Sequence, residues 1–159
     1  MAKNEAKIKF TAETAEFNDA IKKSNSEMSK LRAEFKLNEA EMKNNGASVE
    51  GLEKKHDLLE QQLSAAKDKT EALSGKVEAA TRIFGENSDE VTKLKTQLAN
   101  AQTAEEKIRG AINDCNAELQ RQADAADETE TATENLTDKI ERQQTELKQL
   151  KTDYVNAVA

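Results

Sequence analysis

The sequence predicts an all-α protein built from long antiparallel helical hairpins, a coiled coil of three to four helices with a short N-terminal extended segment. Apolar residues recur at alternating intervals of three and four over most of the chain. This spacing keeps one narrow apolar stripe facing a partner helix. Short segments rich in Gly, Asn and Ser interrupt the stripe at residues 44–48 and 85–88, and it restarts after each. The 159 residues include no proline, which would break such helices.

Composition agrees with an extended helical protein. Hydrophobic residues make up 36% of the chain, charged residues 35% and aromatic residues 3%, too little apolar surface for the core of an ordinary enzyme of this size. A disordered chain can share these values but does not keep a heptad phase. The net charge of −7 argues against nucleic acid or an anionic membrane as partner. No apolar run approaches the roughly twenty residues of a membrane span, so no membrane segment is predicted.

Residues 1–12 are predicted to be extended and strand-like. Within them, residues 6–11 (AKIKFT) alternate polar and apolar side chains and include β-branched and aromatic residues. A first helix is expected over residues 13–45, with Thr11 or Thr14 as its N-cap. The pair Asn45-Gly46 is a strong stop signal.

A second helix is expected over residues 48–84, capped by Ser48 and ended by Gly85. A third helix, over residues 88–125 with Asn87 or Ser88 as its cap, is predicted to form a coiled-coil hairpin with the second. Three glycines fall inside predicted helices but outside the apolar stripe. We expect each to cost about 1 kcal/mol of helix propensity without opening a hole in the core. They are Gly51, Gly75 and Gly110.

Residues 126–159 are either a continuation of the third helix or a fourth helix, truncated where the sequence ends. The acidic, low-complexity stretch at residues 123–133 lacks large apolar residues, and Thr131 with Glu134 fits a capping box. The heptad phase nevertheless continues through it, which favours one helix of roughly 100 Å from about residue 89 to 157. Because the stripe is still running at the last residue, we expect the chain to be part of a longer protein.

The two turns are short enough that successive helices should run antiparallel. Folding about residues 87 and 88 sets Phe84 opposite Val91, and it places the polar residues Thr70 and Glu105 in one layer that would fix the alignment. One narrow stripe on the second helix cannot face both neighbours. Two helices are therefore expected to pair well, while another packs loosely or against a second molecule.

The apolar stripe is the candidate interaction site, and we call it the seam. Its larger members are Val49, Leu52, Leu59, Leu63, Leu73, Val77, Phe84, Val91, Leu94, Leu98, Ile108, Ile112, Leu119, Leu136, Ile140, Leu147 and Leu150.

Catalytic, cofactor-binding and metal-binding residues are not predicted, and the chain is not expected to be an enzyme. The single histidine, His56, lies on the seam and lacks the second His, Cys or converging carboxylates that a metal site needs. The single cysteine, Cys115, also lies on the seam, where a small buried side chain is the expected role. One cysteine cannot form an internal disulfide, which suits a reducing cytoplasm.

The sequence resembles the N-terminal coiled-coil region of phage tail tape measure proteins. The likeness is carried by residues 7–17 (KIKFTAETAEF), by residues 28–31, and by the turn at residues 84–91 (FGENSDEV) with Leu94 and Leu98. Residues 136–140 with Leu150 and Tyr154 extend it. Family members are usually several times longer and carry hydrophobic or enzymatic segments that this chain lacks.

The resemblance implies a structural protein of a phage or prophage that sets tail length during tail assembly. It would be found in the virion tail, and in the host bacterial cytoplasm during assembly. Its partners would be further copies of itself or other tail proteins, namely the tube, the chaperone or the initiator complex. The alternative is a cellular coiled-coil scaffold or adaptor that acts by oligomerisation through the seam.

Overall fold

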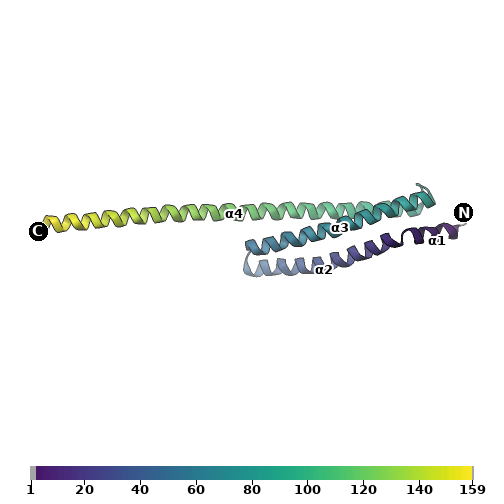
Figure 1. Ribbon diagram of the computed structural model, residues 1–159, viewed down its shortest axis with the longest axis horizontal. Coiled ribbons are helices and arrows are strands. Elements are labelled where there is room, and N and C mark those ends of the chain that lie inside the picture. The colour runs from purple at the N-terminus through teal and green to yellow at the C-terminus, as the bar shows by residue number, and fades with distance from the viewer. Residues whose placement is uncertain (1–2, 159) are drawn as a thin grey trace. The chain divides into compact units, whose positions relative to one another are not determined.

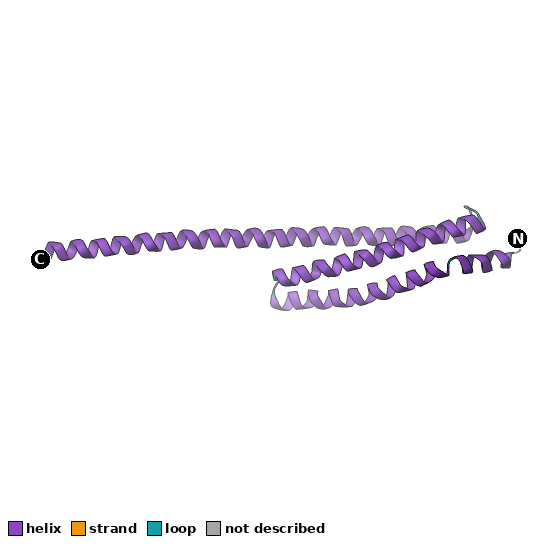
Figure 2. Ribbon diagram, in the orientation of Figure 1, coloured by secondary structure: helices purple, strands orange, loops and turns teal. Residues whose placement is uncertain are grey.

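The computed structural model describes residues 3–158, and the side chains of residues 4–149. These residues form four helices and no strand (Figures 1 and 2). The helices are α1 (Lys3–Glu13), α2 (Ala15–Asn45), α3 (Val49–Phe84) and α4 (Asp89–Val158). The all-α hairpin fold is therefore confirmed. At the two predicted turns, α2 ends at Asn45, α3 begins at Val49 and ends at Phe84, and α4 begins at Asp89.

The predicted extended segment is wrong over residues 3–12, because these residues belong to α1, and residues 1 and 2 lie outside the described part of the chain. The alternating pattern suggested a strand, but a strand is stable only beside another strand. This segment is helical and packs against α3 instead. Ile8 is 71% exposed, while Phe10 packs against the core. The Phe10 and Phe84 rings meet edge to face with centroids 5.2 Å apart. Phe10 and Thr14 precede Phe17 by seven and three residues, so the heptad phase already extended back to them.

Thr14 separates α1 from α2 but is not a working N-cap. Its backbone lies at φ −104° and ψ 7°, and its hydroxyl donates to the Phe10 carbonyl oxygen at 2.8 Å instead of accepting from α2. The amide of Thr14 also donates to Phe10, and the amide of Asn18 donates to Thr14. Helical hydrogen bonds therefore continue across Thr14, which marks a distortion between two nearly continuous helices.

Both hairpin turns combine a glycine with a serine cap. Gly46 and Gly85 have φ of +87° and +85°, a backbone region that is nearly closed to other residues. Ser48 then accepts a hydrogen bond from the Gly51 amide, and Ser88 accepts one from the Val91 amide. These contacts confirm Ser48 as a cap and select Ser88 over Asn87, since each satisfies an amide that the first helical turn leaves free.

The chain divides into two units, Met1–Glu118 and Leu119–Ala159. The first holds α1, α2, α3 and the beginning of α4. Within it, α2 lies beside α3, and the first part of α4 packs on α3 as well (Figure 1). The second unit is helical throughout its described residues. Its threonines at 129, 133 and 137 donate to carbonyl oxygens four residues earlier, so they act inside the helix and do not start a new one.

Candidate interaction surface

In the first unit the seam is a core between helices. Ala80, Val91 and Leu94 form a buried cluster beside the second turn, with Val77 and Phe84 packed against it. This places the residues on either side of Gly85 opposite one another, as predicted. The seam residues that are fully buried here are Leu52, Leu59, Leu63, Leu73, Val91, Leu94, Ile108 and Ile112. Val77, Phe84 and Leu98 are half-buried. Because these side chains already pack within the chain, they are not free to bind another molecule.

Other seam residues are not covered. Val49 is 48% exposed at the first turn of α3. In the second unit, Leu119 is half-buried, whereas Leu136, Ile140 and Leu147 are largely exposed. Leu150 lies outside the residues whose side chains are described. The sequence therefore predicted one seam where the structure has two kinds of surface, a packed one from Leu52 to Ile112 and an open one from Leu136 to Leu147.

A second apolar stripe on α3 escaped the sequence analysis. Its buried members precede the seam residues by one position, and they are Leu58, Gln62, Ala65, Ala72 and Ala79. This stripe faces α2, because Gly51 lies against Met42 and Gly75 lies against Phe17. It was missed because most of its members are alanine. Small residues give a weak hydrophobic signal but let two helices approach closely, and α3 can therefore contact both neighbours.

Gly51 and Gly75 lie at close contacts between α3 and α2, contrary to the expectation that these glycines lie outside the packed face of the helix. A Cβ added at Gly75 would lie 2.6 Å from Cζ of Phe17, and one at Gly51 would lie 2.9 Å from Cγ of Met42. Gly110 behaves as expected, with nothing within 4 Å. The difference follows from the second stripe, because α2 covers a face of α3 that the single predicted stripe left open.

Polar side chains inside the hairpins differ in their hydrogen bonding. Gln62 is buried on α3, and its Nε2 has no hydrogen-bond partner among the described residues. Asn38 is only 2% exposed, and its Nδ2 donates across the α2–α3 contact to the Gly51 carbonyl oxygen at 2.9 Å. The predicted Thr70–Glu105 layer works differently. The Thr70 hydroxyl donates to the Ala66 carbonyl oxygen, and the Glu105 carboxylate pairs with Arg109 at 2.7 Å. Each is thus held within its own helix, whereas the buried Asn38 side chain joins α2 to α3.

Cys115 is buried, and its Sγ donates to the Leu52 carbonyl oxygen at 3.3 Å. Folding the chain about residues 87 and 88 would set Cys115 opposite Leu59, one heptad further along α3 than Leu52, so the observed contact is shifted toward the start of that helix. Burial raises the pKa of the thiol, an effect that the nearby Lys55 opposes and Glu118 reinforces. A protonated, buried thiol is a poor nucleophile.

His56 is partly exposed on α3, where its ring nitrogens lie 3.9 Å from an oxygen of Asp57 and 4.0 Å from one of Glu60. These are loose surface contacts. Among the described residues, no group of three His, Cys, Asp or Glu side chains is arranged to hold a metal ion.

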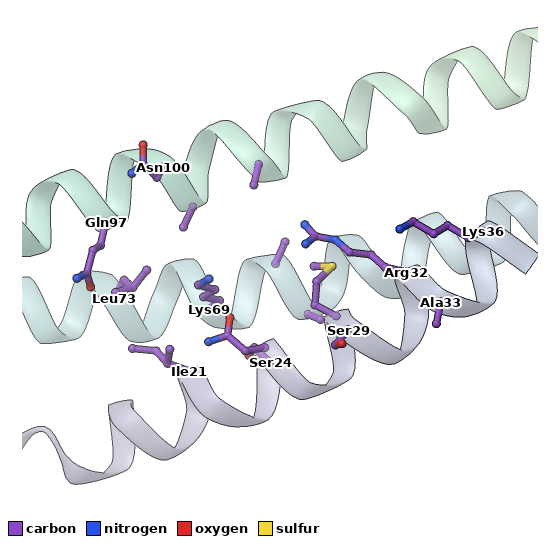
Figure 3. A pocket seen from close by; sticks show the side chains of 16 residues that line it. Ile21, Ser24, Ser29, Arg32, Ala33, Lys36, Lys69, Leu73, Gln97 and Asn100 are labelled. Carbon is purple, nitrogen blue, oxygen red and sulfur yellow. The ribbon is translucent and has the colours of Figure 1, made fainter.

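A groove between α2, α3 and α4 in the first unit has a volume of about 680 Å³. Three cationic side chains line it, Arg32 and Lys36 from α2 and Lys69 from α3 (Figure 3). Amides, small residues and the apolar side chains of Ile21, Met28 and Leu73 complete the lining, and its described residues include no carboxylate, histidine or cysteine. The groove therefore offers no acid–base pair and no activated nucleophile. It forms only where three helices meet, so the sequence could not show it.

Comparisons add no relatives to this description. The chain matches no family model, no curated protein and no solved structure among those searched. Among the described residues, no helix is long and apolar enough to cross a membrane. The fold and the seam thus define a class, an all-helical hairpin protein with an open coiled-coil surface, and no family is assigned.

Proposed function

We propose that this protein is a non-enzymatic structural coiled coil, the N-terminal part of a phage or prophage tail tape measure protein that sets tail length during assembly. The observation that carries the proposal is α4, a helix of 70 residues. A helix adds about 1.5 Å per residue, so residue count converts linearly into length. A protein that measures distance needs this property.

The family resemblance supports the proposal through the turn at residues 84–91 and the helices that flank it. The likeness at residues 7–17 counts for less than the sequence suggested, because that segment is helical. A structural role also agrees with the groove chemistry, which lacks an acid–base pair among its lining residues. The partners proposed with this function are further copies of the chain, or tube, chaperone and initiator proteins of the tail.

A deletion in the parent gene tests whether the helix sets tail length. Removing residues 119–146 takes out four whole heptads and keeps the phase from Glu118 to Leu147, so we expect tails shortened by about 40 Å. Duplicating the same residues should lengthen tails by an equal amount. Electron microscopy of intact tails measures both. Tails of unchanged length in the deletion and the duplication would contradict the proposal.

A cellular scaffold that acts by oligomerisation is the second candidate, favoured by the exposed seam residues Leu136, Ile140 and Leu147. Gene neighbourhood separates the two functions. Genes for a tail tube, a tail chaperone or a baseplate beside this one would favour the tape measure role, and their absence would favour the scaffold.

A further inference from the structure

The second unit presents large apolar side chains to solvent at coiled-coil spacing. Leu136, Ile140 and Leu147 are 58%, 46% and 71% exposed. They follow one another by four and seven residues, so they lie on the same narrow face as Gln143. Every described side chain from residue 123 to 149 is exposed. This face is therefore an apolar surface without a partner inside its own unit.

The same segment is poorly suited to remain helical alone. It is rich in threonine, whose branched side chain lowers helix propensity, and its hydroxyls bond within the helix. Most helical stability in proteins comes from packing an apolar face against a neighbour. A long helix of this composition needs a second helix along its seam.

We infer that a second copy of this chain covers the open seam and forms a parallel, in-register coiled coil through residues 133–149. In heptad terms Ile140 and Leu147 occupy a positions, and Leu136 and Gln143 occupy d positions. Ile140 at a with Leu136 at d is the combination that favours two strands, although Leu147 and Gln143 do not repeat it, and the association that we propose is a dimer. This inference does not depend on the tail function, because either candidate function is compatible with it.

Gln143 determines the direction of the two helices. In a parallel pair each seam residue meets its own copy, so the two Gln143 amides can hydrogen-bond to each other. An antiparallel pair that sets Leu136 against Leu147 puts Gln143 against Ile140, where a buried amide has no partner. Leaving a polar group buried and unpaired is costly, and a polar layer is a common way to fix register.

The charged residues beside the seam favour the same arrangement. By heptad position, Lys139 is a g residue that faces Gln144 of a parallel second copy, so no like charges meet there. A second antiparallel alignment, with Leu136 against Ile140, would avoid burying Gln143 against an apolar residue. It would, however, place the two Lys139 side chains close together near the two-fold axis, where like charges repel.

Sedimentation equilibrium of the full chain tests the association. We expect a dimer for the native sequence and at least about tenfold weaker association for Leu147→Asp, a loss of about 1.4 kcal/mol. The control is Thr145→Asp, which adds the same charge to the same helix outside the seam and should leave association unchanged. Circular dichroism checks that both variants keep the fold of residues 1–118, since Leu147 is exposed and belongs to the other unit. A native chain that stays monomeric, or equal effects of the two variants, would overturn the inference.

Spin labels test the direction of the helices. Labels at Thr131→Cys and Asp138→Cys, each made with Cys115→Ser, occupy the outer f position of successive heptads. A parallel dimer gives the same distance for both, about the width of two helices, roughly 20–25 Å. Either antiparallel alignment gives a clearly longer distance at residue 131 than at residue 138, and that result would overturn the parallel arrangement. Adding Gln143→Leu should tighten the dimer and introduce a second, longer distance at residue 131.

Discussion

Single polar residues fix how the helices of the first unit align. Asn38 is the clearest case, because its buried side chain donates to the Gly51 carbonyl oxygen on the neighbouring helix. Its Nδ2 also approaches the Met42 sulfur at 3.6 Å, so the amide is surrounded on both sides. A hydrogen bond of this kind adds little net stability but holds two helices at one level, because any slip leaves the amide without its acceptor.

Replacing Asn38 tests this contact. Asn38→Ala should lower the free energy of unfolding by about 1–2 kcal/mol, since a hydrogen bond is lost and a cavity opens. Asn38→Leu should cost less, because no buried donor remains and the volume is kept. Urea unfolding followed by circular dichroism measures both. The matched control is Asn25→Ala, an exposed residue of α2 at the groove, expected within about 0.5 kcal/mol of the native chain; an equal loss there would contradict the assignment.

At the scale of elements, α3 is the helix that organises the first unit. Its seam packs on α4, and the adjacent alanine-rich stripe packs on α2. Ion pairs also join α3 to its neighbours, namely Arg82 to Glu13 of α1 at 2.7 Å and Lys55 to Glu39 of α2 at 3.4 Å. They are partly or largely exposed to solvent and contribute little to stability. Close approach at small residues is what makes the contact with α2 possible.

Two glycine substitutions separate close packing from helix propensity. Gly75→Ala should destabilise the chain despite the better propensity of alanine, because the new methyl group meets the Phe17 ring and the ring must move. Gly110→Ala should stabilise it by about 1 kcal/mol, since nothing surrounds that position. Thermal unfolding of the two variants gives the comparison. Stabilisation by both would show that Gly75 is not at a close contact.

At the scale of the whole chain, packing is uneven. Residues before Leu119 bury their seam, whereas residues 123–149 are exposed along their length. Segments with few buried contacts open first. The two units should therefore differ in local stability even though α4 is helical through both.

Limited proteolysis should reveal this difference. In the Leu147→Asp variant, which is expected not to pair, trypsin should cut at Lys139 and Arg142 well before it cuts at Lys55 and Lys76, which are partly covered on α3. Mass spectrometry of early fragments identifies the sites. The native chain at high concentration should resist cleavage at Lys139 and Arg142. Early cuts within α3 at the same rate would contradict a well-packed first unit.

The heptad pattern predicted much of the fold, namely three long helices, both turns, the Ser48 cap and the pairing of Phe84 with Val91. It did not show the alanine stripe on α3, because alanine contributes little to a hydrophobic pattern. It also failed at residues 6–11, where alternating side chains are compatible with a strand or a helix. In the folded chain this segment is a helix whose Phe10 packs against Phe84.

The sequence by itself determined that this protein is helical and where its helices reverse, because apolar spacing and the Gly-Ser turns act through local backbone geometry. Only the tertiary structure decided which seam residues are buried against a neighbouring helix. Leu63 and Leu136 look alike in the heptad pattern, yet one is buried and the other exposed. Burial depends on which helix lies alongside, and that is a property of the folded chain rather than of any local segment.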